Sequence, residues 1–354
     1  MEKVDSGGPQ GYGVRPKTVP VYSGAGRLPP EETMKKILIA AFVAATFSAG
    51  AQDYPTRAIT ITVPNPPGGM NQIHAQPLSA VLEKLTGQPA PIINRAGGVA
   101  AAGTAYVANQ KPDGYNILVT TPNSFLVIEK DKLFGIKSPY SLEGLAMIAL
   151  LSADPLFLTV HPSLPVKTVK ELVALAKTKP NEIVYSSSGL YGIVHVPIEM
   201  FLQATGLKMR HLPTTGGGPA ITQALGGHSQ VTAGGLAAVY PYVAPGKLRA
   251  VANMGGKTAA ALPNVPTLRS MNLDVEAYLW VGLFTTGGTP APILTRMREL
   301  IGKVANDPVF KQALENVQVV PDYRDAPEFK KFFDADYQRL AAAVKKIGRI
   351  DEAK

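Results

Sequence analysis

Short apolar runs alternate with helix-like segments along the chain after residue 57. Each run ends in small or polar residues. Strands that alternate with helices are typical of parallel α/β architecture, and ligands bind at the carboxyl ends of such strands. The pattern therefore predicts an α/β fold whose ligand site lies in the loops after the strands. The predicted strands are residues 58–64, 90–95 and 115–122, and the predicted helices are residues 78–87, 100–110 and 124–130.

The alternation of short strands and helices ends at "MIALLSADPLFLTV", residues 147–160. This stretch predicts two long apolar strands, interrupted by Asp154 and Pro155. A second α/β unit follows. Another extended segment, "AYLWVGLFTT", then precedes two helical stretches at residues 291–307 and 326–348.

Long extended segments that bracket a central block suggest that one domain is inserted into another. We expect domain one to comprise residues 52–154 and 282–354, and domain two to comprise residues 155–281. A cleft between the two domains would then hold the ligand.

A secretory signal is predicted near the N-terminus. From Met34 the chain reads "MKKILIAAFVAATFSAGAQDYP", which has a basic start, an apolar run too short to span a bilayer, and an A-x-A cleavage site. We expect residues 34–51 to be a signal peptide, cleaved after Ala51, and the mature protein to be periplasmic. Residues 1–33 are rich in Gly, Pro and charge, so we interpret them as a disordered leader that is non-native or wrongly assigned, with Met34 as the true start.

Composition narrows the function classes. Of 354 residues, 45% are hydrophobic and 17% are charged, as in soluble globular proteins. The absence of cysteine excludes a disulfide framework, a thiolate zinc site and a cysteine nucleophile. The net charge of +9 comes from scattered Lys and Arg, which predicts no nucleic-acid partner. The five histidines are widely spaced and form no H-E-x-x-H pair, so we expect no metal site.

The first candidate site is the turn in "TVPNPPGGMNQIHAQ". Gly68 and Gly69 permit a tight turn, and the helix after it presents unpaired N–H groups and the positive end of its dipole. Such a terminus binds an anion without a charged side chain, here helped by Asn71 and Gln72. An ordinary strand-to-helix turn is the alternative. Pro77 predicts a kink or a displaced helix start.

The second candidate site is "VYSSSGLYGIVH", residues 184–195. Three serines and Gly189 after a strand offer hydroxyls and amides to a carboxylate or phosphate. A nucleophile elbow needs G-x-S-x-G, which this stretch lacks, so no catalytic serine is expected. His195 either orients a hydroxyl or contacts the ligand, or it is structural.

The third candidate site is the glycine-rich turn in "LPTTGGGPAITQALGG", residues 212–227. A dinucleotide motif that starts at Gly216 would need glycine at residue 221, which is Ile. The nearby "MGGKT" ends like a phosphate-binding P-loop, but the loop would need glycine at residue 251, which is Val. No cofactor is therefore expected.

These motifs, in order, resemble those of the solute-binding proteins of tripartite tricarboxylate transporters, the Bug receptors. The similar segments include "YPTRAITITVPNPPGGMNQIHAQPL", "NRAGGVAAAGTAYVANQKPDGYNILVTT", "YSSSGLYGIVH", "HLPTTGGGPAITQALGG" and "WVGLFTTGGTP", and they cover essentially all of the mature chain. The resemblance implies a two-domain, periplasmic-binding-protein-like (type II) α/β fold that closes over a small carboxylate. It further implies delivery of that ligand to integral membrane subunits.

The resemblance also implies which residues bind the ligand. One carboxylate would lie on the first turn, through amides and ordered water, and an aromatic side chain near the hinge would cover the ligand. The implied ligand-binding residues are Pro67, Gly68, Gly69, Met70, Asn71, Gln72, Asn123, Ser124, Ser187, Ser188, Gly189, His195, Thr214, Thr215, Gly216, Gly217, Gly218, Gly234, Gly235 and Trp280.

Departures from the family pattern indicate the ligand class. The family often has an acidic residue where this chain has Gln72, which argues against recognition of an ammonium group. An aromatic residue and a lysine of the third loop are replaced by Thr214 and Thr215, and Gly235 replaces a common aspartate. An uncharged, roomier pocket favours a dicarboxylate, aliphatic or aromatic.

The preferred hypothesis is thus a monomeric periplasmic receptor that is not an enzyme. A secreted α/β enzyme that acts on an anionic substrate is the first alternative, but it would need a clustered acid–base or nucleophile pair, which the sequence does not show. A ligand sensor for a membrane signalling partner is the second alternative, because the same closed form could serve transport or regulation.

Overall fold

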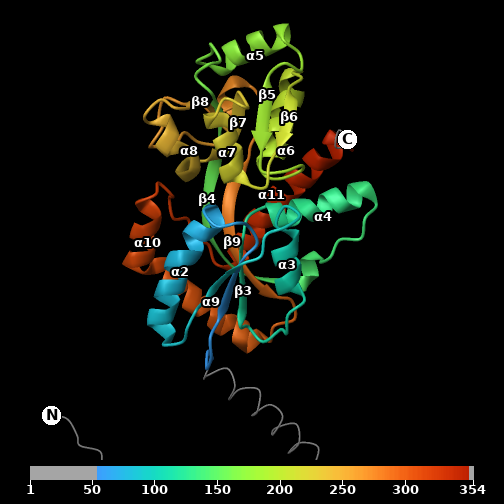
Figure 1. Cartoon of the computed structure of the whole chain (residues 1–354). Coiled ribbons are helices and arrows are strands. Elements are labelled where there is room, and N and C mark those ends of the chain that lie inside the picture. Colours follow the sequence, from blue (N-terminus) through green and yellow to red (C-terminus); the bar gives the residue numbers. More distant parts are fainter. Residues whose placement is uncertain (1–53, 351–354) are drawn as a thin grey trace, which may run out of the picture. The chain divides into compact units, whose positions relative to one another are not determined.

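The computed structural model describes residues 54–350, which fall within one compact unit (Figure 1). The predicted leader and signal peptide lie outside the described residues. No helix in the described part of the chain is both long and apolar enough to cross a membrane.

Nine strands of the described residues form one sheet in the order β2-β1-β3-β9-β4-β7-β5-β6, with β8 paired to β4. β1, β2 and β3 are parallel to one another, as are β5, β6 and β7, whereas β4 and β9 run antiparallel to their neighbours. The strands are β1 Thr60–Val63, β2 Ile92–Asn94, β3 Asn116–Thr120, β4 Leu145–Val160, β5 Val184–Ser187, β6 Arg210–Pro213, β7 Val231–Gly235, β8 Arg249–Asn253 and β9 Tyr278–Thr286.

β4 corrects the sequence prediction, because the two strands expected around Asp154 and Pro155 are one continuous strand. Its first part pairs with β9 as far as Pro155, and its second part pairs with β7 from Leu156 onward. Proline has no N–H to give to a ladder, and here it stands where the strand changes partners. In Figure 1 β4 and β9 run between the two groups of parallel strands.

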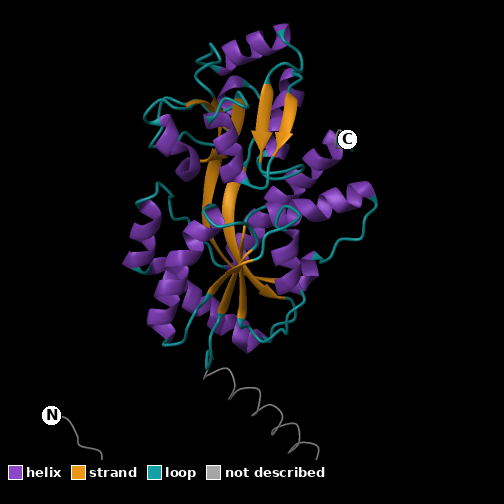
Figure 2. Ribbon diagram, in the orientation of Figure 1, coloured by secondary structure: helices purple, strands orange, loops and turns teal. Residues whose placement is uncertain are grey.

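Helices cover the strands on both sides (Figure 2). Most of the predicted helices are present, and α2 begins directly at Met70 and continues through Pro77. The sequence patterns did not predict α8 and α10. The helices are α2 Met70–Thr86, α3 Ala101–Ala108, α4 Asn123–Phe134, α5 Val169–Thr178, α6 His195–Thr205, α7 Gly217–Leu225, α8 Leu236–Val243, α9 Ala291–Asn306, α10 Pro308–Glu315 and α11 Ala326–Ile347, with 3-10 turns at Leu142–Gly144 and Arg269–Met271.

An aromatic cluster fills the space between β9, α4 and α11. Phe125 contacts Trp280, Phe284 and Phe333 with ring-centroid distances of 5.7, 5.2 and 4.7 Å. All four side chains are buried. Apolar packing therefore fixes the first turns of α4, which border the site described next.

Candidate functional site

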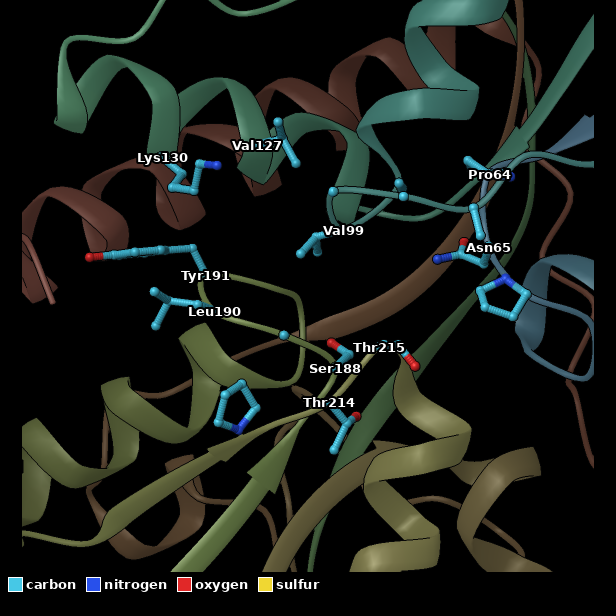
Figure 3. Close-up of a pocket in the computed structure, with 17 residues that line it drawn as sticks. Pro64, Asn65, Val99, Val127, Lys130, Ser188, Leu190, Tyr191, Thr214 and Thr215 are labelled. Carbon is cyan, nitrogen blue, oxygen red and sulfur yellow. The ribbon is translucent and has the colours of Figure 1, made fainter. Parts of the chain in front are cut away.

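Two adjacent cavities lie where the parallel strands end. The first, of about 310 Å³, is the uncharged cavity, because none of the described residues that line it has a charged side chain. The second, of about 610 Å³, is the Lys130 cavity, in which Lys130 is the one charged residue among the described lining residues (Figure 3). Asn65, Pro66 and Ser188 line both, so the two cavities adjoin.

Five helices begin at the uncharged cavity. Their N-cap residues are Gly69 of α2, Pro122 of α4, Val194 of α6, Gly216 of α7 and Gly235 of α8. None has a side-chain cap, and none has an acidic residue in its first turn. The N-cap side chains therefore leave the first-turn N–H groups and the positive ends of these helix dipoles uncapped, although the N–H groups of Val194 and Gly216 lie 3.4 Å from the hydroxyls of Ser188 and Thr214.

Three of the described helices that begin away from the uncharged cavity are capped by side chains, whereas α3, whose N-cap residue is Ala100, is not. Thr168 caps α5 by accepting the N–H of Glu171, and Asp307 and Asp325 cap α10 and α11 in the same way. α9 begins away from both cavities without a side-chain cap, at Pro290. Among the described helices, side-chain caps are therefore found only at helices that begin away from the uncharged cavity.

The glycines of the first and third turns leave open space above the helix starts. A Cβ placed on Gly69, Gly217 or Gly218 would meet no atom within 4 Å. Gly68 has φ +91°, a left-handed conformation that favours glycine. A ligand can therefore approach the backbone of both turns closely.

Two asparagines organise the uncharged cavity. Asn123, at the start of α4, accepts the N–H of Ile193 through Oδ1 at 2.7 Å and thereby joins α4 to the loop before α6. Asn71 donates to Oδ1 of Asn65 at 2.5 Å, and its own Oδ1 is buried without a partner in the structure. The neighbouring Gln72 accepts from Asn94 at 3.1 Å.

The structure brings most of the predicted site residues together at these cavities. Pro67, Gly68, Gly69, Met70, Asn71, Gln72, Asn123, Ser188, Gly216, Gly217, Gly218, Gly234 and Gly235 line the uncharged cavity, and Ser188, Gly189, Thr214 and Thr215 line the Lys130 cavity.

Two predicted serines lie behind the cavities. Ser124 is buried, and its hydroxyl lies 2.6 Å from the hydroxyls of Thr104 and Thr120. Ser187 is also buried and lies 2.7 Å from Nε2 of His211. Neither lines the described cavities. Both hold in place the loops that do line them.

His195 is buried as well and lines neither cavity. Its Nδ1 accepts the N–H of Tyr191 at 3.2 Å, and its ring centroid lies 4.3 Å from that of His211. Burial, with a smaller contribution from His211, lowers the pKa of His195 to about 3. The imidazole is therefore neutral at physiological pH and supports the loop that carries Ser188 and Gly189.

Trp280 does not line either cavity. It is 1% exposed within the aromatic cluster, and its Nε1 donates to Oδ2 of Asp336 at 2.8 Å. An indole that is enclosed on all sides by packed rings is placed to stabilise the fold around β9 rather than to cover a ligand.

Several lining residues were not anticipated from the sequence. They are Asn65, Thr121, the loop at residues 96–100, and Val127 and Lys130 of α4. The spacing of Asn123, Val127 and Lys130 could have indicated that Val127 and Lys130 lie near the site, because residues at i, i+4 and i+7 share a helix face.

The lining of the uncharged cavity is rich in groups that can donate hydrogen bonds. Among residues 54–350, no group of three or more His, Asp or Glu side chains could hold a metal ion. The uncharged cavity presents amides, hydroxyls and carboxamides around an apolar floor that includes Met70 and Leu279. A carboxylate with an apolar body satisfies such a surface.

Comparisons with known proteins identify relatives of the chain. Residues 75–349 match the sequence profile of the "Tripartite tricarboxylate transporter family receptor". Protein BugT of Bordetella pertussis is 28% identical over 300 residues, which cover 84% of this chain and 91% of that protein.

Solved structures are similar as well. One described as "a periplasmic transporter" is 28% identical with a TM-score of 0.76, over 83% of this chain and 98% of that one. An R. palustris protein with adipate is 24% identical with a TM-score of 0.73, over 83% and 98% of the two chains, and so shares the fold.

Proposed function

The chain belongs to the tripartite tricarboxylate transporter receptor family, and we propose that it captures a dicarboxylate, aliphatic or aromatic, and delivers it to integral membrane subunits of a transporter. The family consists of solute-binding receptors rather than enzymes, and its mixed α/β fold is that of periplasmic binding proteins. Export through the predicted signal peptide and action as a monomer in the periplasm are parts of the proposal.

The convergence of five uncapped helix starts on the uncharged cavity supports this proposal best. Backbone N–H groups at the helix starts that follow both groups of parallel strands would donate charge-assisted hydrogen bonds to one carboxylate of the ligand. The cavity holds no carboxylate that could receive an ammonium group, which favours a dicarboxylate over an amino acid. The R. palustris protein with adipate shares only the fold with this chain, so its ligand carries no conclusion for this chain. The proposed ligand class rests on the lining of the uncharged cavity.

The change of strand partners along β4 supports the proposed division into two domains. Pairing with β9 ends at Pro155, and pairing with β7 begins at Leu156. We place domain one at residues 52–154 and 282–354 and domain two at residues 155–281. Closure of the domains would be driven by ligand contacts that exist only in the closed form.

A thermal-shift screen of residues 52–354 tests the function. The panel contains mono-, di- and tricarboxylates, amino acids and nucleotides. A ligand present at a hundred times its Kd adds about 2.7 kcal/mol to the free energy of unfolding, which gives a clear rise in Tm. Stabilisation by dicarboxylates supports the proposal, whereas a response to amino acids or nucleotides alone contradicts it.

A further inference from the structure

One face of α4 connects the two cavities. Asn123 lines the uncharged cavity, and Val127 and Lys130 line the Lys130 cavity. These residues are at positions i, i+4 and i+7, so they share one helix face. Seven residues of helix span roughly 10 Å, so the backbone of Lys130 lies about that far along the helix axis from the backbone of Asn123.

Apolar side chains form part of the wall of the Lys130 cavity. Figure 3 shows Lys130 and Val127 projecting from α4, with Val99 and Leu190 across the cavity. Such walls reduce the water around an ion, so its attraction for an opposite charge is stronger than at an open surface.

Lys130 retains donors for a ligand. Its Nζ lies 3.1 Å from Oδ1 of Asp131, and its side chain is 33% exposed. An ammonium group has three N–H donors, and Asp131 can use one of them. Lys132 on the same helix differs, because it is 63% exposed, pairs with Glu129 at 2.8 Å and lines neither cavity.

We propose that Lys130 binds the distal carboxylate of an extended dicarboxylate, while the first carboxylate lies on the uncapped helix starts of the uncharged cavity. The aliphatic or aromatic body of the ligand lies along Val127, Val99 and Leu190. This inference rests on the proposed function and narrows it, since it selects long dicarboxylates with an apolar body over short hydroxy acids.

Isothermal titration calorimetry with matched ligand pairs tests the inference. The pairs are hexanoate and adipate, octanoate and suberate, and benzoate and terephthalate, which differ by one carboxylate each. In the wild-type protein at least one dicarboxylate should bind roughly 10- to 100-fold more tightly than its monocarboxylate partner, as expected for a charge-assisted hydrogen bond.

Substitution should then remove this gain selectively. Lys130→Met should reduce the ratio of dicarboxylate affinity to monocarboxylate affinity to about one. Lys130→Arg should preserve most of the gain, and the matched control Lys132→Met should behave as wild type. Lys130→Gln replaces Lys130→Met if circular dichroism shows that the latter does not fold.

The outcomes separate the two proposals. If the wild-type protein binds no carboxylate at all, the proposed function fails. If it binds dicarboxylates but Lys130→Met and Lys130→Gln keep the full gain, the role of Lys130 is wrong and the proposed function stands. A gain that is lost equally in Lys132→Met would also overturn the role of Lys130, because it would reflect net charge alone.

Discussion

Asp154 and Gly235 lie side by side on one face of the sheet where β4 changes partners, because a Cβ on Gly235 would stand 3.9 Å from Cβ of Asp154. Gly235 lines the uncharged cavity, whereas Asp154 lines a different cavity of about 940 Å³, together with Lys257 and Val320. Asp154 is 3% exposed, and its Oδ2 has no partner in the structure. A buried acid therefore lies next to a residue that lines the uncharged cavity.

The stability of the fold should depend on the protonation of Asp154. Burial raises the pKa of this carboxyl from 3.8 to about 7, with a smaller contribution from Asp322 and opposed by the N–H of Val320. The folded protein holds the proton more tightly than the unfolded chain, so the stabilisation is complete below pH 3.8 and is lost as pH rises through about 7.

Asp154→Asn tests this dependence. The amide stays neutral, so the stability of the variant relative to the wild type should be greater at pH 8.5 than at pH 5, by on the order of 3 kcal/mol or less. Thermal melts at both pH values measure the difference. An equal shift at both values would show that Asp154 does not titrate in this range.

Gly218→Ala should weaken ligand binding without loss of stability. The added Cβ meets no protein atom within 4 Å, and alanine favours helix, but the methyl group enters the uncharged cavity. We expect a Kd for the best dicarboxylate that is roughly 10-fold higher and a Tm at or above that of the wild type.

Gly103→Ala is the contrasting control. A Cβ there would lie 2.6 Å from Cα of Pro64, so this variant should lose stability instead. Calorimetry and thermal melts on both variants distinguish the two effects. Unchanged ligand affinity in Gly218→Ala would remove the third glycine turn from the site.

Asn123→Asp should repel a carboxylate while it preserves the local structure. The new side chain can still accept the N–H of Ile193, but it places a negative charge at the start of α4. Like charges in a poorly hydrated site cost several kcal/mol, so we expect a loss of affinity of roughly 100-fold or more. The affinity of the variant relative to that of the wild type at the same pH should recover as pH falls and the aspartate becomes protonated, whereas a pH-independent loss would point to misfolding.

Trp280→Phe should change stability but not affinity. The substitution leaves a void among packed rings and removes the hydrogen bond to Asp336, at a cost of about 2–3 kcal/mol. The Kd of a dicarboxylate should remain within about twofold, since Trp280 lines neither cavity. A large rise in Kd with an unchanged Tm would instead support the cover over the ligand that the family resemblance implies.

Local signals in the sequence determined much of this protein. Glycine-rich turns directly after apolar runs predicted where helices begin and where an anion would bind, because conformational freedom and unpaired amides are properties of the chain itself. The first turn, which includes Gly68, Gly69 and Gln72, has no charged residue, and the cavity that it lines has no charged side chain among its described lining residues. The order of the motifs along the chain was sufficient to identify the family.

Only the tertiary structure decided which candidates face the ligand space. Ser187 and Ser188 are neighbours with the same side chain, yet Ser188 lines both cavities and Ser187 is turned toward His211. Trp280 packs against aromatic rings from distant segments of the chain. Lys130 lines a cavity because α4 lies beside the loop that carries Leu190. Such outcomes depend on long-range packing, in which a side chain's direction is set by partners that no local pattern reveals.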